Sequence, residues 1–196
     1  LMTNTIVDDI IWEKQKAIGV KVRKEEGEVY ADLIIIADGL NSIIIRKAKF
    51  RNDFSPEQVA VGVKEVIKLP EEEINKRFGL KGQEGSAYTF VGYATKGIEG
   101  GGFLYTNKNS ISLGVVCNLS GLLREKLGPY EVIEDFKSHP SIKRLIEGGN
   151  LKEYAGHLIN EGGFDAMPPL FTDGLLVTGD AAAMCINNGA TIRGVD

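Results

Sequence analysis

Residues 173–183 read DGLLVTGDAAA, a turn pair followed by an apolar run and then by a Gly-Asp pair with small residues after it. An apolar run of this length between turn residues is typical of a β-strand. Glycine at the end of a strand lets a ligand approach the backbone, and the carboxylate of Asp180 can accept hydrogen bonds from ligand hydroxyls. The stretch therefore predicts a strand that ends at a ligand; the alternative is a buried strand followed by an ordinary turn.

The next residues contain the sequence Asn-Asn-Gly at 187–189 and continue to Arg193. This sequence suits the start of a helix, whose free N–H groups and positive dipole end attract a phosphate or an electron-rich ring edge. We expect that helix to include the last residue, Asp196.

A second stretch far upstream ends in a similar way. Residues 31–42 read ADLIIIADGLNS, a short apolar run that leads into Asp38 and Gly39. A continuous apolar run is typical of a strand buried on both faces of a parallel sheet, where ligands bind at the carboxyl ends of the strands. We expect the two strand ends to meet at one ligand, with a short helix at 41–49 beyond. In the alternative, Asp38 and Gly39 only form a turn.

Together the two stretches resemble the Asp-Gly and Gly-Asp motifs of FAD-dependent oxidoreductases of the glutathione reductase class, in the branch of the aromatic hydroxylases. The sequence between them resembles the FixC family, which is related to electron transfer flavoprotein–quinone oxidoreductase. This second resemblance covers nearly the whole chain and is carried by VGVKEV at 61–66, GGGFLYTN at 100–107, HLI at 157–159, EGG at 161–163, GDAA at 179–182 and TIRG at 191–194.

The resemblance implies both a function and a fold. In such proteins FAD takes electrons from an electron transfer flavoprotein and passes them toward a quinone or a ferredoxin-like partner. The implied fold class is α/β plus α+β. Residues 1–54 and 170–196 would form part of an FAD domain of the glutathione reductase class, and residues 55–169 an inserted substrate or partner domain with an antiparallel sheet. The alternatives are a geranylgeranyl reductase of the same fold and a non-catalytic domain.

The resemblance also assigns residues to the cofactor. Asp180 is expected to hold ribityl hydroxyls, and Asp38 is expected to contact the ribityl or pyrophosphate region. Backbone N–H groups from Asn188 to Thr191 are expected to stabilise negative charge on the pyrimidine edge of the reduced flavin. The full set expected at the cofactor is Asp38, Gly39, Ser42, Gly179, Asp180, Ala181, Asn188, Gly189, Ala190 and Thr191.

Three successive glycines at 100–102 cost conformational entropy, unless the backbone must approach another surface closely or take a positive φ. One interpretation is a wall of the isoalloxazine or substrate pocket, formed by Gly101, Gly102, Phe103 and Tyr105. The other is a mobile entry to a hairpin, and the sequence does not separate the two. No acid–base pair or nucleophile is visible, which suits electron transfer by a cofactor.

The rest of the chain shows further strand and helix signals. Residues 3–32 predict a small antiparallel meander, and Pro70 to Gly79 predict a surface helix that starts with proline and stops at glycine. Further strands are expected at 59–69, 87–94, 102–105, 111–119 and 153–159, and helices at 129–148 with a break before Pro140.

A FixC-like protein is expected to begin with a βαβ unit that carries G-x-G-x-x-G for the FAD pyrophosphate, and no such spacing occurs in this chain. We therefore interpret the chain as an internal segment of a longer flavoprotein.

The composition excludes several classes of partner. With 43% hydrophobic and 26% charged residues and a net charge of -4, the chain has no basic stripe for nucleic acid. No run of 18 apolar residues occurs, so we expect a cytoplasmic protein, with peripheral contact at the membrane face left open. Cys117 and Cys185 are expected to be buried thiols, and the two isolated histidines, His139 and His157, do not predict a metal site.

Overall fold

A computed structural model of the chain describes residues 1–23, 27–187 and 192–194, and it divides into two compact units. The first unit comprises Leu1–Gln58 with Asn160–Asp196, and the second comprises Val59–Ile159. The sequence analysis placed the divisions after residues 54 and 169, so the structure places the second division earlier. Residues 160–169 belong to the first unit because the Glu161 N–H donates to the Gln58 carbonyl at 2.7 Å. The roles assigned to the two parts stay predictions.

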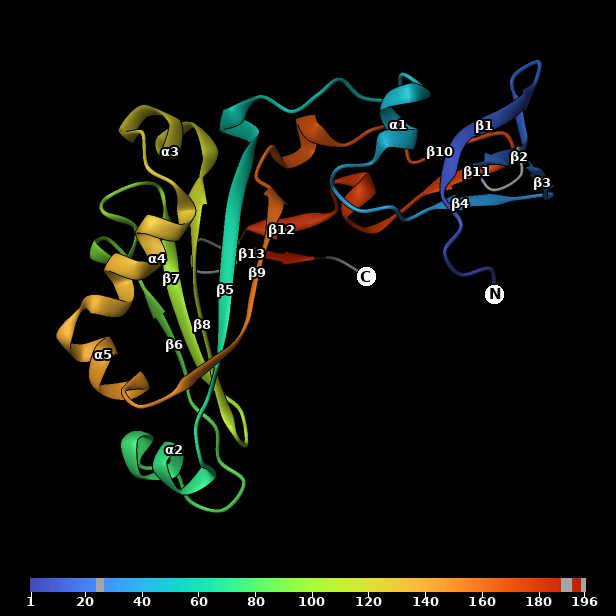
Figure 1. The fold of residues 1–196 in the computed structure, drawn as a ribbon. Coiled ribbons are helices and arrows are strands. Elements are labelled where there is room, and N and C mark those ends of the chain that lie inside the picture. Colours follow the sequence, from blue (N-terminus) through green and yellow to red (C-terminus); the bar gives the residue numbers. More distant parts are fainter. Residues whose placement is uncertain (24–26, 188–191, 195–196) are drawn as a thin grey trace. The chain divides into compact units, whose positions relative to one another are not determined.

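The first unit consists mainly of short strands (Figure 1). Its strands are β1 (Val7–Glu13), β2 (Lys16–Val22), β3 (Gly27–Tyr30), β4 (Ile34–Ile36), β10 (Phe171–Thr172), β11 (Leu175–Val177), β12 (Cys185–Asn187) and β13 (Ile192–Gly194). Its helices are α1 (Ile43–Lys47) and the 3₁₀ turns η2 (Pro56–Gln58), η4 (Gly163–Ala166) and η5 (Gly179–Ala182). β1, β2 and β3 form the antiparallel meander that the alternating pattern predicted.

A single hydrophobic core holds the first unit together. Ile10 and Ala17 from the meander pack with Ile36, Leu175 and Ile45, and all five are buried. The turn before β11 is fixed to β2, since the Ala17 N–H donates to the Asp173 carbonyl at 2.9 Å. The predicted helix at 41–49 is confirmed as α1.

The helix expected after the Gly-Asp pair is not found at the described positions. Ile192–Gly194 instead pair with Cys185–Asn187 as two antiparallel strands. The β-branched residues Ile186 and Ile192 favour paired extended backbone over a helix. Residues 188–191 lie outside the described residues, and the expectation placed on them is not tested.

The second unit is a five-stranded sheet in the order β6-β7-β8-β5-β9. Its strands are β5 (Val59–Lys68), β6 (Ala87–Phe90), β7 (Gly100–Thr106), β8 (Ser110–Asn118) and β9 (Asn150–Asn160). Its helices are α2 (Glu71–Phe78), α3 (Leu119–Glu125), α4 (Pro129–Ser138), α5 (Pro140–Ile146) and the 3₁₀ turn η3 (Tyr93–Thr95). Gly100 to Gly102 lie within β7, so the hairpin-entry interpretation of the glycines does not hold.

The helices cover one face of this sheet, and Figure 1 shows α3, α4 and α5 on the same side of it. Val132, Ile133 and Phe136 of α4 are buried against strand residues such as Leu113 and Val115. Along each strand, these buried residues alternate with residues whose side chains point to the opposite face of the sheet. In the described part of the chain, no helix is long and apolar enough to cross a membrane.

Candidate functional site

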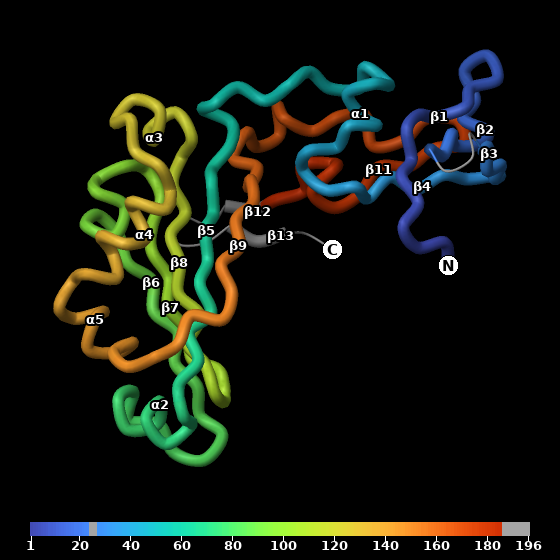
Figure 2. The backbone as a smooth tube through the Cα atoms, viewed as in Figure 1, coloured from blue at the N-terminus to red at the C-terminus, as the bar shows by residue number. Residues whose placement is uncertain are grey.

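The two predicted strand ends lie side by side in the first unit, as the sequence analysis expected (Figure 2). β4 and β11 are parallel, and Ile36 pairs with Val177. The N–H of Thr178 donates to the Ile36 carbonyl at 3.0 Å, which extends the pairing past the strand. Asp38 lies two residues after Ile36, and Gly179 lies two residues after Val177. The Asp-Gly and Gly-Asp motifs therefore reach the same edge of the sheet.

Glycine at these strand ends is explained by backbone conformation. Gly39 has a φ of 79° and Gly179 a φ of 63°, values that residues with a side chain rarely adopt. A Cβ added at either glycine would meet no heavy atom within 4 Å. The space where a Cβ would stand is therefore open at both glycines within the described residues, as the close approach of a ligand requires.

The carboxylate of Asp180 lies at the start of η5 and is exposed. Its Oδ1 accepts a hydrogen bond from the Cys185 thiol at 3.9 Å. Burial raises the pKa of the Cys185 thiol, and the negative charge of Asp180 raises it further. The thiol is therefore neutral at physiological pH. Ala181, the third predicted residue here, has its side chain fully buried in the core, so it can offer a ligand only its backbone.

Ser42 carries a buried hydroxyl at this edge whose hydrogen bonding no described residue satisfies. The residue is 1% exposed, and its Oγ has no hydrogen-bond partner among the described residues. A buried hydroxyl without a partner costs about 1–3 kcal/mol, so such groups are rare.

Arg51 lies close to the same turn and was not recognised in the sequence. Its Nη2 donates to the Leu40 carbonyl at 3.0 Å, and its guanidinium stacks at 3.8 Å on the ring of Phe54. Burial and the neighbouring Arg46 lower the pKa of Arg51, while Asp38 acts in the opposite direction. Nε and Nη1 are buried without a partner among the described residues, so they too are available to a ligand.

Ser42→Ala is expected to stabilise the protein without its cofactor by up to about 1 kcal/mol, because it removes a buried hydroxyl that has no partner. The matched control is Ser112→Ala. Ser112 is 3% exposed, but its Oγ accepts from the Asn107 amide at 3.1 Å, so its loss is expected to cost about 1 kcal/mol. Urea unfolding of both variants gives the comparison, and equal losses at the two serines would contradict it.

In the second unit, three cross-strand rows lie on the sheet face opposite the helices, which we call the helix-free face. Residues opposite one another in an antiparallel pair point to the same side. The rows are Gly101–Val116–Gly62, Phe103–Gly114–Lys64 and Tyr105–Ser112–Val66.

The helix-free face combines aromatic rings with glycines. The rings of Phe103 and Tyr105 are stacked, with centroids 6.1 Å apart and an angle of 18° between their planes. The Phe103 ring covers Gly114, where a Cβ would lie 2.4 Å from Cζ of that ring. Gly101, Phe103 and Tyr105 thus lie together as the pocket interpretation requires.

Gly102 differs from the other residues of the predicted pocket. It points to the helix side of the sheet, and a Cβ there would lie 2.8 Å from the Ala94 Cβ and 3.1 Å from Cζ of Phe136. Packing under α4, and not an approaching ligand, accounts for glycine at this position.

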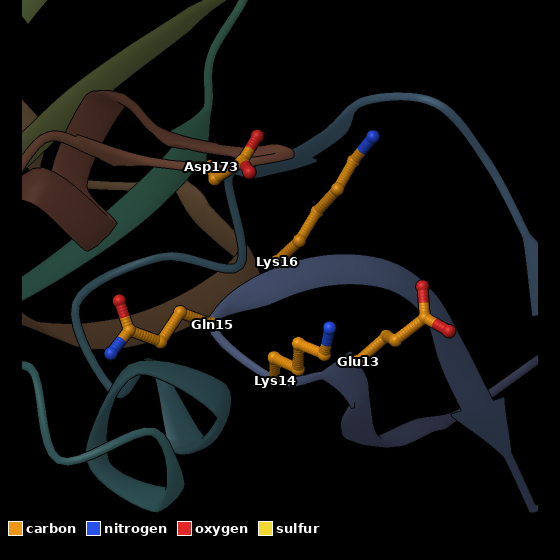
Figure 3. Close-up of a pocket in the computed structure, with 5 residues that line it drawn as sticks. All are labelled: Glu13, Lys14, Gln15, Lys16 and Asp173. Atoms are coloured by element: carbon orange, nitrogen blue, oxygen red, sulfur yellow. The ribbon is translucent and has the colours of Figure 1, made fainter.

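A depression of about 580 Å³ lies elsewhere in the first unit (Figure 3). Its lining residues are Glu13, Lys14, Gln15, Lys16 and Asp173. They are charged or polar and surround the turn between β1 and β2, and none of the predicted site residues lines it. His157 is exposed on β9, and the described residues contain no group of three or more His, Cys, Asp or Glu that suits a metal.

The second unit matches the model of a known protein family. A family model described as "ETF-QO, ubiquinone-binding" matches residues 59–159. These are the bounds of the second unit.

Curated relatives match over the whole chain. Protein FixC of Escherichia coli strain K12 is 46% identical, and the match covers 100% of this chain and 45% of that protein. The probable electron transfer flavoprotein-quinone oxidoreductase YdiS of the same strain is 45% identical, and the match covers 97% of this chain and 44% of YdiS. The chain therefore spans less than half the length of these relatives.

Solved structures show the same fold at low sequence identity. A geranylgeranyl bacteriochlorophyll reductase-like protein from Thermoplasma acidophilum superposes with a TM-score of 0.70 at 16% identity, covering 92% of this chain and 42% of its own. The flavin-dependent brominase Bmp2 gives a TM-score of 0.64 at 18% identity, covering 91% of this chain and 43% of its own. At such identities the likeness concerns the fold alone, and it is consistent with an α/β fold of flavoprotein type that includes antiparallel sheets.

The ubiquinone-binding model covers about half of the chain, and the likeness to FixC extends over all of it. This chain belongs to the family of FixC and electron transfer flavoprotein–quinone oxidoreductase.

Proposed function

We propose that the chain is part of an FAD-dependent oxidoreductase that takes electrons from an electron transfer flavoprotein and passes them to a quinone. The observation that carries the proposal is the match of the ubiquinone-binding model to residues 59–159, a unit whose sheet has a helix-free face with aromatic rings and glycines. The name of YdiS, a probable electron transfer flavoprotein-quinone oxidoreductase, supports the donor and the acceptor. A ferredoxin-like acceptor is the alternative, and the quinone is preferred because of the matched model.

The first unit would hold the flavin at the joint edge of β4 and β11. When bound, FAD supplies the redox chemistry, since it exchanges electrons with both partners. The exposed Asp180 carboxylate would accept hydrogen bonds from ribityl hydroxyls, and Gly39 and Gly179 would allow the cofactor close to the backbone. The buried Oγ of Ser42, which has no described partner, supports a ligand at this edge. The roles predicted for residues 188–191 stay part of the proposal.

The second unit would bind the acceptor on the helix-free face. The stacked rings of Phe103 and Tyr105 offer an apolar wall for a planar ring. Ubiquinone is dissolved in the lipid phase, so the proposal includes peripheral contact with the cytoplasmic face of a membrane.

The test of the cofactor site is a visible absorption spectrum of the protein expressed with the coding sequence that flanks it in its native reading frame. We expect flavin bands that fall at least about tenfold in occupancy in Asp180→Ala and in Asp38→Ala, because each loses acceptors for the cofactor. The control is Asp173→Ala, which removes an acid from the depression in Figure 3 and is expected to leave the bands unchanged.

The outcomes separate the two sites. A colourless protein that also fails to take up added FAD would overturn the flavoprotein proposal. Loss of flavin in Asp173→Ala with full retention in Asp180→Ala would place the cofactor at the depression and not at the joint edge of β4 and β11.

A further inference from the structure

Lys64 is the one cationic side chain in the three rows of the helix-free face. It lies in β5, an interior strand with β8 on one side and β9 on the other. Its partner across the β5–β8 pair is Gly114, which in turn is opposite Phe103. The lysine is partly buried, so its position in the middle of a sheet requires a physical reason.

An ion pair with another described residue does not supply that reason. The neighbouring acid, Glu65, points to the opposite face, because successive side chains of a strand alternate. Glu65 is 1% exposed and pairs there with Lys137 of α4 at 2.9 Å. Within the described residues Lys64 has no hydrogen bond or ion pair, and the nearest acid in sequence is already paired.

Small and aromatic residues surround Lys64 on the helix-free face. Two positions next to it on the same face are glycines, Gly62 two residues earlier in β5 and Gly114 across the strand pair. The Phe103 ring lies over Gly114, and Lys64 is on the other side of Gly114 in the same row. Phe103 and Lys64 are two strand spacings apart, about 10 Å, so a ligand ring beside Phe103 would have its edge within reach of the long lysine side chain.

We propose that Lys64 binds a carbonyl oxygen of the quinone acceptor through its ammonium group and stabilises the negative charge that this oxygen gains on reduction. This inference rests on the proposed function and adds the residue that recognises the acceptor. The reduction takes two electrons from the reduced donor flavoprotein and two protons from solvent, and it converts the quinone to the hydroquinone. The ammonium holds the oxygen charge until the proton arrives and is itself unchanged at the end. Charge-assisted hydrogen bonds of this kind are about twice as strong as neutral ones.

The test compares Lys64→Gln with Lys68→Gln in the protein expressed with its native flanking sequence and loaded with flavin. Lys68 lies in the same strand and on the same face, four residues further, but it is exposed and opposite Ser110. The anaerobically reduced protein is mixed with ubiquinone-1, and reoxidation is followed by stopped-flow absorbance. Binding of ubiquinone-1 to the oxidised protein is measured separately by calorimetry.

We expect Lys64→Gln to lower both the rate constant of reoxidation and the affinity for ubiquinone-1, by about tenfold to a hundredfold. Lys68→Gln is expected to change either quantity less than about twofold. Lys64→Arg keeps the charge and is expected to restore most of the affinity, which a purely structural role of the lysine would not require. Thermal unfolding of Lys64→Gln is expected to match that of the unmodified protein.

The failures of the two proposals are distinguishable. Rapid reoxidation of the unmodified protein together with an unchanged Lys64→Gln variant would overturn the role of Lys64 and leave the proposed function intact. An unmodified protein that ubiquinone-1 neither binds nor reoxidises would overturn the quinone as acceptor, and the inference with it. An altered flavin reduction potential in Lys64→Gln with unchanged quinone affinity would show that the charge acts on the cofactor and would also overturn the inference.

Discussion

Gly114→Ala is expected to destabilise the second unit by about 3 kcal/mol, although it adds a single methyl group. The reason is geometric: a Cβ at this position would lie 2.2 Å from the Val63 carbonyl oxygen and 2.4 Å from Cζ of Phe103. The Phe103 ring can move, but the Val63 oxygen belongs to the backbone of an interior strand that pairs with β8 along nine positions. The strands must therefore separate or twist locally, and urea unfolding should show a lower midpoint.

The control for this change is Gly85→Ala in the same unit. A Cβ at Gly85 would have ordinary contact with the Thr106 Oγ1 at 3.7 Å, and we expect a change within about 0.5 kcal/mol. Equal midpoints for the two variants would contradict the packing argument. The Phe103 ring covers Gly114 on the helix-free face, so the variant is also expected to weaken ubiquinone-1 binding.

The sequence predicts those elements whose signals are local. β4 and β11 are apolar runs that end in Asp-Gly or Gly-Asp, and the structure confirms that they are parallel neighbours. The helix after Pro70 is confirmed as α2, and Gly79 ends it in the left-handed conformation with a φ of 67°. The local backbone conformation determines which residues suit a turn or a helix cap. A short stretch of sequence is therefore sufficient to recognise them.

The sequence analysis missed α3, which begins directly after β8. Asn118 ends the strand and caps the helix, since its Oδ1 accepts from the Ser120 N–H at 3.0 Å. Gly121 lies inside the helix and argues against it on propensity alone. A Cβ at Gly121 would lie 2.5 Å from Cγ2 of Ile98, so tertiary packing favours the glycine there.

The helix-free face also depends on information that is not local. Which face a glycine or lysine occupies follows from the register of three strands, and the 111–119 pattern alone does not align Gly114 with Lys64 and Phe103. The same holds for Arg51, whose hydrogen bond to the Leu40 carbonyl spans eleven positions. The motif residues of the site were predictable, whereas the residues that register and tertiary contacts add to it were not.

Lys137→Met is expected to lower the stability of the second unit by about 3 kcal/mol, because it leaves Glu65 as a buried carboxylate without its cation. Glu65 is 1% exposed, and Lys137 donates to it at 3.1 Å and to Glu134 at 2.6 Å. Removing both charges in Glu65→Leu with Lys137→Met is expected to recover most of the loss, since no carboxylate is then buried without its cation. The control Arg124→Met breaks the exposed pair with Glu125 and is expected to cost less than about 0.5 kcal/mol.

The pH dependence of this loss follows from the pKa of Lys137. Burial alone would lower that pKa, but the hydrogen bonds to Glu134 and Glu65 outweigh burial, and the pKa is raised. A lysine with a raised pKa contributes its full stabilisation below the unfolded pKa of about 10.4 and loses it as the pH rises through the folded pKa. The stability difference between the unmodified protein and Lys137→Met should thus be constant from about pH 7 to about pH 9 and shrink above about pH 10.4, measured by urea unfolding at each pH. A difference that is the same at high and neutral pH would show that lost packing of the lysine stem, and not its charge, causes the destabilisation.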